Sequence, residues 1–178
     1  MKKIAIIAVA LAVSVCIIVA ATSTRQANAE FLRIHIRADS NESSDQSVKY
    51  VVKTAVVDYL TPYLTGATTK QKAMEIVKLH LADIKAVCDR TLAANGKNYS
   101  ATIKLCEEEF PDRSYNGFTL QAGVYDALIV ELGSGSGNNW WCVVYPPLCF
   151  VGGEGSSDGN IVYKSKLLEI IERWKSSR

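Results

Sequence analysis

Several segments of the chain alternate between apolar and polar residues, with the two-residue period of a β-strand. Residues 31–37 and 99–106 alternate throughout, which predicts strands with one face on a core and the other face polar. Residues 128–132 and 140–145 group apolar side chains between turn-forming residues and are expected to form further strands. The polar face of the first strand carries Arg33, His35 and Arg37.

Other segments have the period of an amphipathic helix. Apolar residues recur at steps of three and four over residues 48–60, which predicts a helix that ends before Pro62. Ser43 and Gln46 have the spacing of a capping box and are expected to begin this helix.

A second apolar stripe covers residues 73–92 and predicts another long helix, which begins near Thr68 and ends at residues 95–96. Residues 167–174 predict a C-terminal helix. The order of these elements predicts an α+β fold. We expect a small mixed or antiparallel sheet of about four to five strands, covered by two long helices plus the C-terminal helix.

The N-terminal 29 residues have the organisation of a secretory signal peptide. Lys2 and Lys3 precede an apolar run over residues 4–21, and a polar segment then leads to a small-residue site between Ala29 and Glu30. We expect cleavage there, with residues 1–29 as the signal peptide and 30–178 as a single exported domain. The apolar run is also nearly long enough for an uncleaved membrane anchor, so that alternative stays open.

Charge and composition exclude some classes of partner. Apolar residues make up 48% and charged residues 21% of the chain, which is typical of a globular protein. Without the three basic residues of the first 29 positions, 17 basic and 18 acidic residues remain. This balance offers no basic face for nucleic acid, and contact with a membrane is expected only through the N-terminal segment or a partner.

Export changes the interpretation of the cysteines. Cys16 lies in the targeting segment, and an even number remains, as is typical of a disulfide-bonded exported domain. Cys142 and Cys149 bracket two prolines and are the first candidate pair. Cys88 and Cys106 are a possible second pair, although Cys106 falls on the polar face of its predicted strand. The spacing matches no common zinc motif, so no metal is expected.

No catalytic group can be assembled from the sequence alone. Cys142 with His35 or His80 could supply a nucleophile and a base, but nothing brings them together. Residues 107–109 are three glutamates, which are best interpreted as a solvated charge cluster. The glycine-rich residues 133–137 lack the features of a phosphate-binding loop and are expected to form a flexible connection. We therefore expect no catalytic residue and no cofactor.

The segment from residue 137 to 150 concentrates rare, large and rigid side chains. Alternation places Trp140 and Trp141 on opposite faces of one strand, so both cannot easily enter a one-sided core. At least one of them is a candidate anchor for a partner, because tryptophan is enriched at interface hot spots. Packing in the core is the competing explanation. The candidate contact residues are Trp140, Trp141, Tyr145, Pro146, Pro147 and Phe150.

Three blocks of the chain resemble the stage II sporulation protein R family of endospore-forming bacteria. They are residues 36–53, residues 110–128 with their FPDRSYNG and QAGVYDAL motifs, and NWWCVVYPPLCF at 139–150. The last block is long and rich in rare residues and is the most specific. The chain departs from the family pattern at Asp39, Asn41 and Gln121, and its glycine connection lacks an acidic residue.

The resemblance implies a role in signalling between compartments. Such a protein is exported from the forespore into the space between the two membranes. There it activates a membrane-embedded aspartic protease of the mother cell, which removes the pro-sequence of the sporulation sigma factor E. The resemblance thus implies a non-catalytic protease activator. The alternative class is an exported hydrolase that acts on cell-wall material through a cysteine nucleophile.

Overall fold

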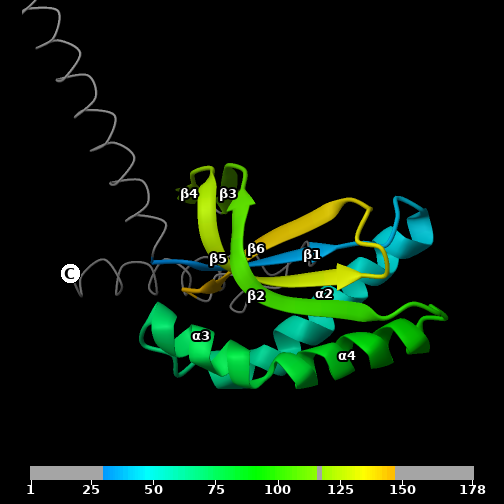
Figure 1. Cartoon of the computed structure of the whole chain (residues 1–178), viewed down its shortest axis with the longest axis horizontal. Coiled ribbons are helices and arrows are strands. Elements are labelled where there is room, and N and C mark those ends of the chain that lie inside the picture. The colour runs from blue at the N-terminus through cyan, green and yellow to red at the C-terminus, as the bar shows by residue number, and fades with distance from the viewer. Residues whose placement is uncertain (1–29, 116–117, 147–178) are drawn as a thin grey trace, which may run out of the picture.

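A computed structural model of the protein describes residues 30–115 and 118–146. A four-stranded mixed sheet lies on a layer of helices, and a short hairpin stands on the opposite side (Figure 1). The predicted α+β class is confirmed. The sheet consists of β1 (Leu32–Arg37), β2 (Ala101–Phe110), β5 (Gly123–Leu132) and β6 (Asn139–Tyr145). The helices are α2 (Ser43–Leu64), α3 (Lys70–Leu79) and α4 (Leu81–Ala94), and the hairpin is β3 (Arg113–Tyr115) with β4 (Phe118–Leu120).

The order of strands in the sheet is β2-β5-β1-β6. β1 runs parallel to β5 and antiparallel to β6, and β2 is antiparallel to β5. In the middle of β1, His35 lies between Ile129 of β5 and Trp141 of β6. The first strand of the chain is therefore central, and this position buries it on both faces.

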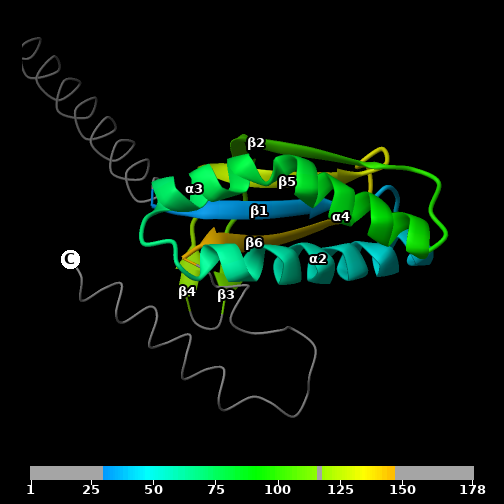
Figure 2. The ribbon, with the colours of Figure 1, turned by 90° about the horizontal axis from the view of Figure 1, so that it is seen from below.

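The main core lies between the sheet and the helices. Figure 2 views the molecule from the helical side, with α2 on one flank and α3 followed by α4 on the other. The apolar stripe of α2 is fully inside this core, and α4 contributes a shorter stripe. Regular four-residue spacing puts these side chains on one helix face, where burying each contributes about 1.5–3 kcal/mol. The stripes are Val48, Val52, Val56, Leu60 and Leu64, and Ile84, Cys88 and Leu92.

A second, smaller apolar cluster lies on the other side of the sheet, which we call the second face. Phe110 ends β2 and packs with Tyr125 of β5 and with Leu120 of the hairpin. The hairpin stands over this end of the sheet (Figure 1). The alternation of β1 predicts an exposed polar side here, but Arg33 and His35 are 0% and 1% exposed. The polar side of this strand is therefore the base of a packed layer.

The second predicted helix is wrong in its continuity, because the chain breaks it at His80 into α3 and α4. His80 has φ −97° and ψ 8°, outside the helical region. Its ring Nδ1 lies 2.8 Å from the hydroxyl of Tyr59 on α2, which fixes the junction. The break lets two short helices follow the sheet. The N-cap of α3 is Thr69 rather than Thr68, and the Thr69 hydroxyl accepts the N–H of Lys72.

The predicted C-terminal end of α2 is also wrong, whereas the helix begins at Ser43 as predicted. Pro62 lies inside the helix, which continues to Leu64 because that side chain is buried in the core. At the other end, Ser43 is already helical and makes no capping box with Gln46; the amide of Gln46 instead donates to Ser40 O at 2.8 Å. The predicted C-terminal helix over residues 167–174 lies outside the described residues.

Candidate functional site

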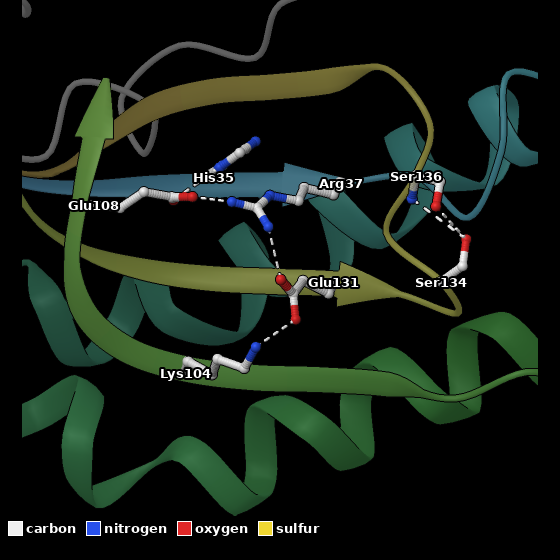
Figure 3. A network of polar contacts seen from close by, with 7 residues as sticks. All are labelled: His35, Arg37, Lys104, Glu108, Glu131, Ser134 and Ser136. Carbon is white, nitrogen blue, oxygen red and sulfur yellow. Dashed lines mark hydrogen bonds and ion pairs between the residues drawn. The ribbon is translucent and has the colours of Figure 1, made fainter. Parts of the chain in front are cut away.

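The connection between β5 and β6 is held against the end of β1. Residues 133–138 and 38–41 form a hydrogen-bonded pair of segments that we call the clasp. Ser134 donates its backbone N–H to Asp39 Oδ1 at 2.6 Å and its hydroxyl to Asp39 O at 2.7 Å. Ser134 and Ser136 also contact each other (Figure 3). The prediction of a flexible connection is wrong, because these bonds fix the loop.

Gly137 and Asn138 extend the contacts of the clasp as far as the first residue of β6. Gly137 donates its N–H to Ala38 O at 2.9 Å, and a side chain at Gly137 would collide with the backbone of Ser40. The buried ammonium of Lys49 reaches across from α2 and donates to Asn138 O at 3.0 Å. The strand that carries the two tryptophans therefore starts from a fixed point.

The adjacent tryptophans lie on opposite faces of β6, as alternation predicts. Trp140 packs against the core on the helical side, where the Lys53 ammonium lies 5.5 Å from its ring centroid. Trp141 packs on the second face. Both side chains are half-buried. Each tryptophan thus has one packed side and one accessible side, and the role of either as a partner anchor stays a prediction.

Aromatic and imidazole rings hold the Trp141 ring in place. His35 stacks on it with a centroid distance of 3.6 Å and an interplanar angle of 16°. Phe110 meets it edge-on at 4.8 Å. The guanidinium carbon of Arg113, on the hairpin, lies 5.6 Å from the ring centroid. Contacts from three separate strands make Trp141 a rigid part of the second face.

A chain of charged side chains crosses the same face (Figure 3). Arg37 bonds to Glu108 of β2 and, at 2.7 Å, to Glu131 of β5. Lys104 donates to the other oxygen of Glu131 at 2.7 Å, and His35 Nδ1 lies 2.9 Å from Glu108. The glutamate run at 107–109 is thus not uniformly solvated, because Glu108 is paired on both oxygens.

His35 is neutral in this arrangement. Burial lowers its pKa to about 4, from an ordinary value of 6.5, because the charged imidazolium would lose its solvation. A neutral ring beside a carboxylate places its proton on Nδ1, which donates to Glu108. Nε2 is then an acceptor, and it is buried with no hydrogen-bond partner among the described residues. His35 therefore orients Glu108 and supports Trp141.

Arg33 is the least satisfied polar side chain of the second face. Its guanidinium carbon lies 4.1 Å from the Phe110 ring centroid and 4.8 Å from that of Tyr125. Nη2 donates to the hydroxyl of Tyr115 at 2.9 Å. Nε and Nη1 are buried and make no hydrogen bond within the described part of the chain. Burial is the main cause that lowers the pKa of Arg33 from its ordinary value.

The tryptophan strand lies in a region that the chain shares with known proteins. The family model for stage II sporulation protein R matches residues 28–154, which is most of the chain. The chain belongs to the stage II sporulation protein R family. A protein of Bacillus subtilis (strain 168), named stage II sporulation protein R, is 34% identical over 120 residues. The match covers 67% of this chain and 54% of that protein, so the chain spans about half its relative's length. No solved structure matches.

The family motifs of this chain meet at the clasp and the second face. Asp39 and Asn41 depart from the expected pattern, yet both accept backbone N–H groups, from Ser134 and from Asn138. The substituted side chains therefore retain a structural role. Sequence reasoning missed Arg33, Glu108 and Arg113 as members of one site, because three different elements bring them together.

The first candidate disulfide of this family member stays a prediction, because Cys149 lies outside the described residues. The second candidate pair is wrong, since Cys88 and Cys106 are free cysteines. Cys88 is buried on α4 in the main core, whereas Cys106 is exposed on β2. Its neighbours on alternate positions, Lys104 and Glu108, belong to the second face, so the sheet itself separates the two thiols.

The structure does not bring Cys142 together with His35. Cys142 packs in the core on the helical side, whereas His35 lies on the second face. His80 is engaged by Tyr59 and Asp83 at the α3–α4 junction. Within residues 30–115 and 118–146, no group of three or more His, Cys, Asp or Glu side chains could hold a metal ion. No described helix is both long enough and apolar enough to cross a bilayer.

Two of the predicted contact residues are buried instead of forming an accessible surface. Tyr145 is 8% exposed, and its hydroxyl donates to Thr68 O at 2.8 Å. Pro146 is also buried. Tyr145 therefore anchors the end of β6 against the helical layer. Pro147, Phe150 and Ala29 lie outside the described residues.

Proposed function

We propose that this member of the family is an exported signalling protein that activates a membrane-embedded aspartic protease of the mother cell. Its action leads to processing of the sigma factor E precursor. Membership of the family supports a role in sporulation. The N-terminal signal pattern supports export from the forespore into the intermembrane space. The protein acts by binding, and the protease supplies the chemistry.

The observation that carries this proposal is the state of Trp141. Its ring is half-buried, stacked on His35 and in contact with Phe110, within the most specific motif of the family. A rigid aromatic ring loses little conformational freedom on association, so its contacts contribute more to binding. Trp141, with the charged residues beside it, is the docking surface that we propose for the outward-facing portion of the protease.

Replacement of Trp141 by alanine tests this surface. Cells that co-express the protease, the sigma factor precursor and this protein should process the precursor about thirtyfold less with Trp141→Ala, since hot-spot truncations cost about 2 kcal/mol or more. The measurement is the ratio of processed to unprocessed sigma factor on an immunoblot. Tyr50→Ala is a matched control, because Tyr50 is a 50% exposed aromatic residue on α2 in the other layer.

Export and folding of each variant must be measured beside processing. A Trp141→Ala protein that is exported, melts cooperatively and still supports full processing contradicts the docking assignment. Turnover of cell-wall fragments by the purified protein, abolished by Cys142→Ala, would instead establish the hydrolase alternative.

A further inference from the structure

Two arginines gather around one pair of aromatic rings on the second face. Arg33 lies over Phe110, with 4.1 Å between its guanidinium carbon and the ring centroid. Arg113 lies over Trp141 at 5.6 Å. The two rings touch edge to face at 4.8 Å. β1, the end of β2, the hairpin and β6 therefore bring two positive charges to one corner.

Neither of these arginines has a carboxylate partner among the described residues. The other cations of the second face are paired: Arg37 with two glutamates, and Lys104 with one of them. Arg33 and Arg113 lie near enough that Arg113 contributes to lowering the pKa of Arg33, after the larger effect of burial. Two positive charges close together are unfavourable unless a negative charge from another molecule balances them.

Arg33 also has hydrogen-bonding capacity that the protein leaves unused. It is 0% exposed, and its Nε and Nη1 donors have no partner in the part of the chain that the structure describes. Buried donors are nearly always satisfied in folded proteins, and a charged one left alone is especially costly. Arg113 is exposed at the mouth of the same corner. The arrangement therefore has an outer arginine that is accessible and an inner arginine that is unsatisfied.

We infer that this corner is an acceptor site for one carboxylate on an acidic segment of the partner. A carboxylate matches a guanidinium fork and provides the missing acceptors. The charge of the face agrees, because four cations, Arg33, Arg37, Lys104 and Arg113, stand against three carboxylates, Glu108, Glu131 and Asp112, with His35 neutral. The inference rests on the proposed docking function and names the chemistry of the segment that docks.

The first strand of the hairpin contacts the inner arginine. Tyr115 of β3 accepts the bond from Arg33, and β3 and β4 form a two-stranded sheet of their own. Each of its strands is only three residues long. The carboxylate binds first at Arg113 and reaches Nε and Nη1 of Arg33 after a local movement of the Tyr115 side chain. The partner thus adds a charged acceptor for the two donors that the hydroxyl of Tyr115 leaves unsatisfied.

A pair of blocked peptides, Gly-Gly-Asp-Gly-Gly and Gly-Gly-Asn-Gly-Gly, tests the site without the protease. The exported chain is labelled with ¹⁵N-arginine, and the Nε–H signal of Arg33 is assigned by its loss in Arg33→Lys. We expect a saturable shift of this signal with the Asp peptide alone, and about tenfold weaker binding by Arg113→Gln. Equal shifts with both peptides, or unchanged affinity in Arg113→Gln, overturn the inference.

The processing assay tests the same site with the partner present. Arg113→Glu should reduce processing about tenfold, because reversing a charge opposite an acidic segment is repulsive. Lys72→Glu is the matched control, since Lys72 is an exposed lysine of α3 on the helical layer. Changing one acidic residue of the protease to lysine should restore processing with Arg113→Glu and so identify the carboxylate.

The two proposals fail in different ways. Normal processing by Arg113→Glu together with loss in Trp141→Ala overturns the carboxylate site and leaves the docking surface standing. Normal processing by both variants overturns both. A shift with the Asp peptide but full processing by Arg113→Glu shows an anion site that the partner does not use, which also overturns the inference.

Discussion

Replacing Gly137 with alanine tests whether the clasp holds the tryptophan strand in position. A Cβ at this residue would lie 2.5 Å from the carbonyl carbon of Ser40 and closer still to its oxygen, whereas ordinary contacts are 3.4–4 Å. The obstacle is backbone, so one segment of the clasp must move by roughly 1 Å to restore normal contact. Gly137 has no positive φ, so the expected effect comes from the collision rather than from backbone strain.

The magnitude follows from the hydrogen bonds next to the collision. Gly137 N to Ala38 O, at 2.9 Å, and Ser136 N to Asp39 O, at 3.2 Å, both cross the clasp. Asn138 N to Asn41 Oδ1, at 2.7 Å, is the third. Losing about 1 kcal/mol for each gives a destabilisation of about 3 kcal/mol. For a domain of this size that corresponds to a Tm lower by about 10 °C.

Thermal unfolding followed by far-UV circular dichroism measures this change, and near-UV circular dichroism reports the tryptophan environment. Gly66→Ala is the matched control. It has no atom within 4 Å of the added Cβ and no positive φ, so it should be neutral or stabilise by about 0.4–1 kcal/mol. A Gly137→Ala protein that melts within about 2 °C of wild type would refute the argument that the clasp is tightly packed.

Three further predictions concern titration and thiol chemistry. The Asp45 carboxylate accepts hydrogen bonds from Lys97, Ser40 and Tyr99, which lower its pKa to about 2, from an ordinary value of 3.8. Asp45→Asn should therefore be less stable than wild type near neutral pH, and the difference in Tm between the two proteins should shrink as the pH falls from about 4 to about 2. Burial lowers the pKa of His35 to about 4, so the unfolded chain binds a proton more readily than the folded chain, and the wild type should lose stability as the pH falls from about 6.5 to 4. A Tm that stays constant over this pH window, or a Tm of His35→Gln that falls with the same slope, would contradict a buried neutral ring. Exposed Cys106 should react with a maleimide in the native protein, whereas Cys88, whose thiol pKa is raised to about 12 by burial, should react only on unfolding. Mass spectrometry of the labelled peptides measures both reactions, and labelling of Cys88 in the native protein would contradict its packing.

The elements were largely predictable from periodicity, whereas their exact limits depended on tertiary contacts. The stripe from Val48 to Leu60 predicts α2, but only the burial of Leu64 explains why the helix passes Pro62. The apolar stripe over residues 73–92 predicts the buried positions correctly. The helix is nevertheless interrupted at His80, where the hydroxyl of Tyr59 contacts the ring. Local sequence does not reveal these partners, which are in contact in space but many residues away in the chain.

The site was less predictable than the fold. Alternation correctly separates Trp140 from Trp141, because that depends on one strand alone. It also places Arg33 and His35 together on one side of β1, but predicts that side to be exposed. Their burial follows from the central position of β1, which in turn follows from the strand order. A usable signal was nevertheless present, since Phe110 ends the polar face of β2 with a large apolar ring.

The two faces of β1 link the stability of the fold to the proposed docking surface. Leu32, Ile34 and Ile36 are 0% exposed in the main core, and the residues between them support the second face. Trp141 stacks on His35 of this strand. A partner that binds Trp141 would therefore meet a surface that the helical core behind it holds in place. That rigidity argues against a large rearrangement of the sheet on binding, and leaves the β3–β4 hairpin as the part of the second face that can adapt. The unsatisfied donors of Arg33, beneath Tyr115 of that hairpin, lie where such a local adjustment would gain the most.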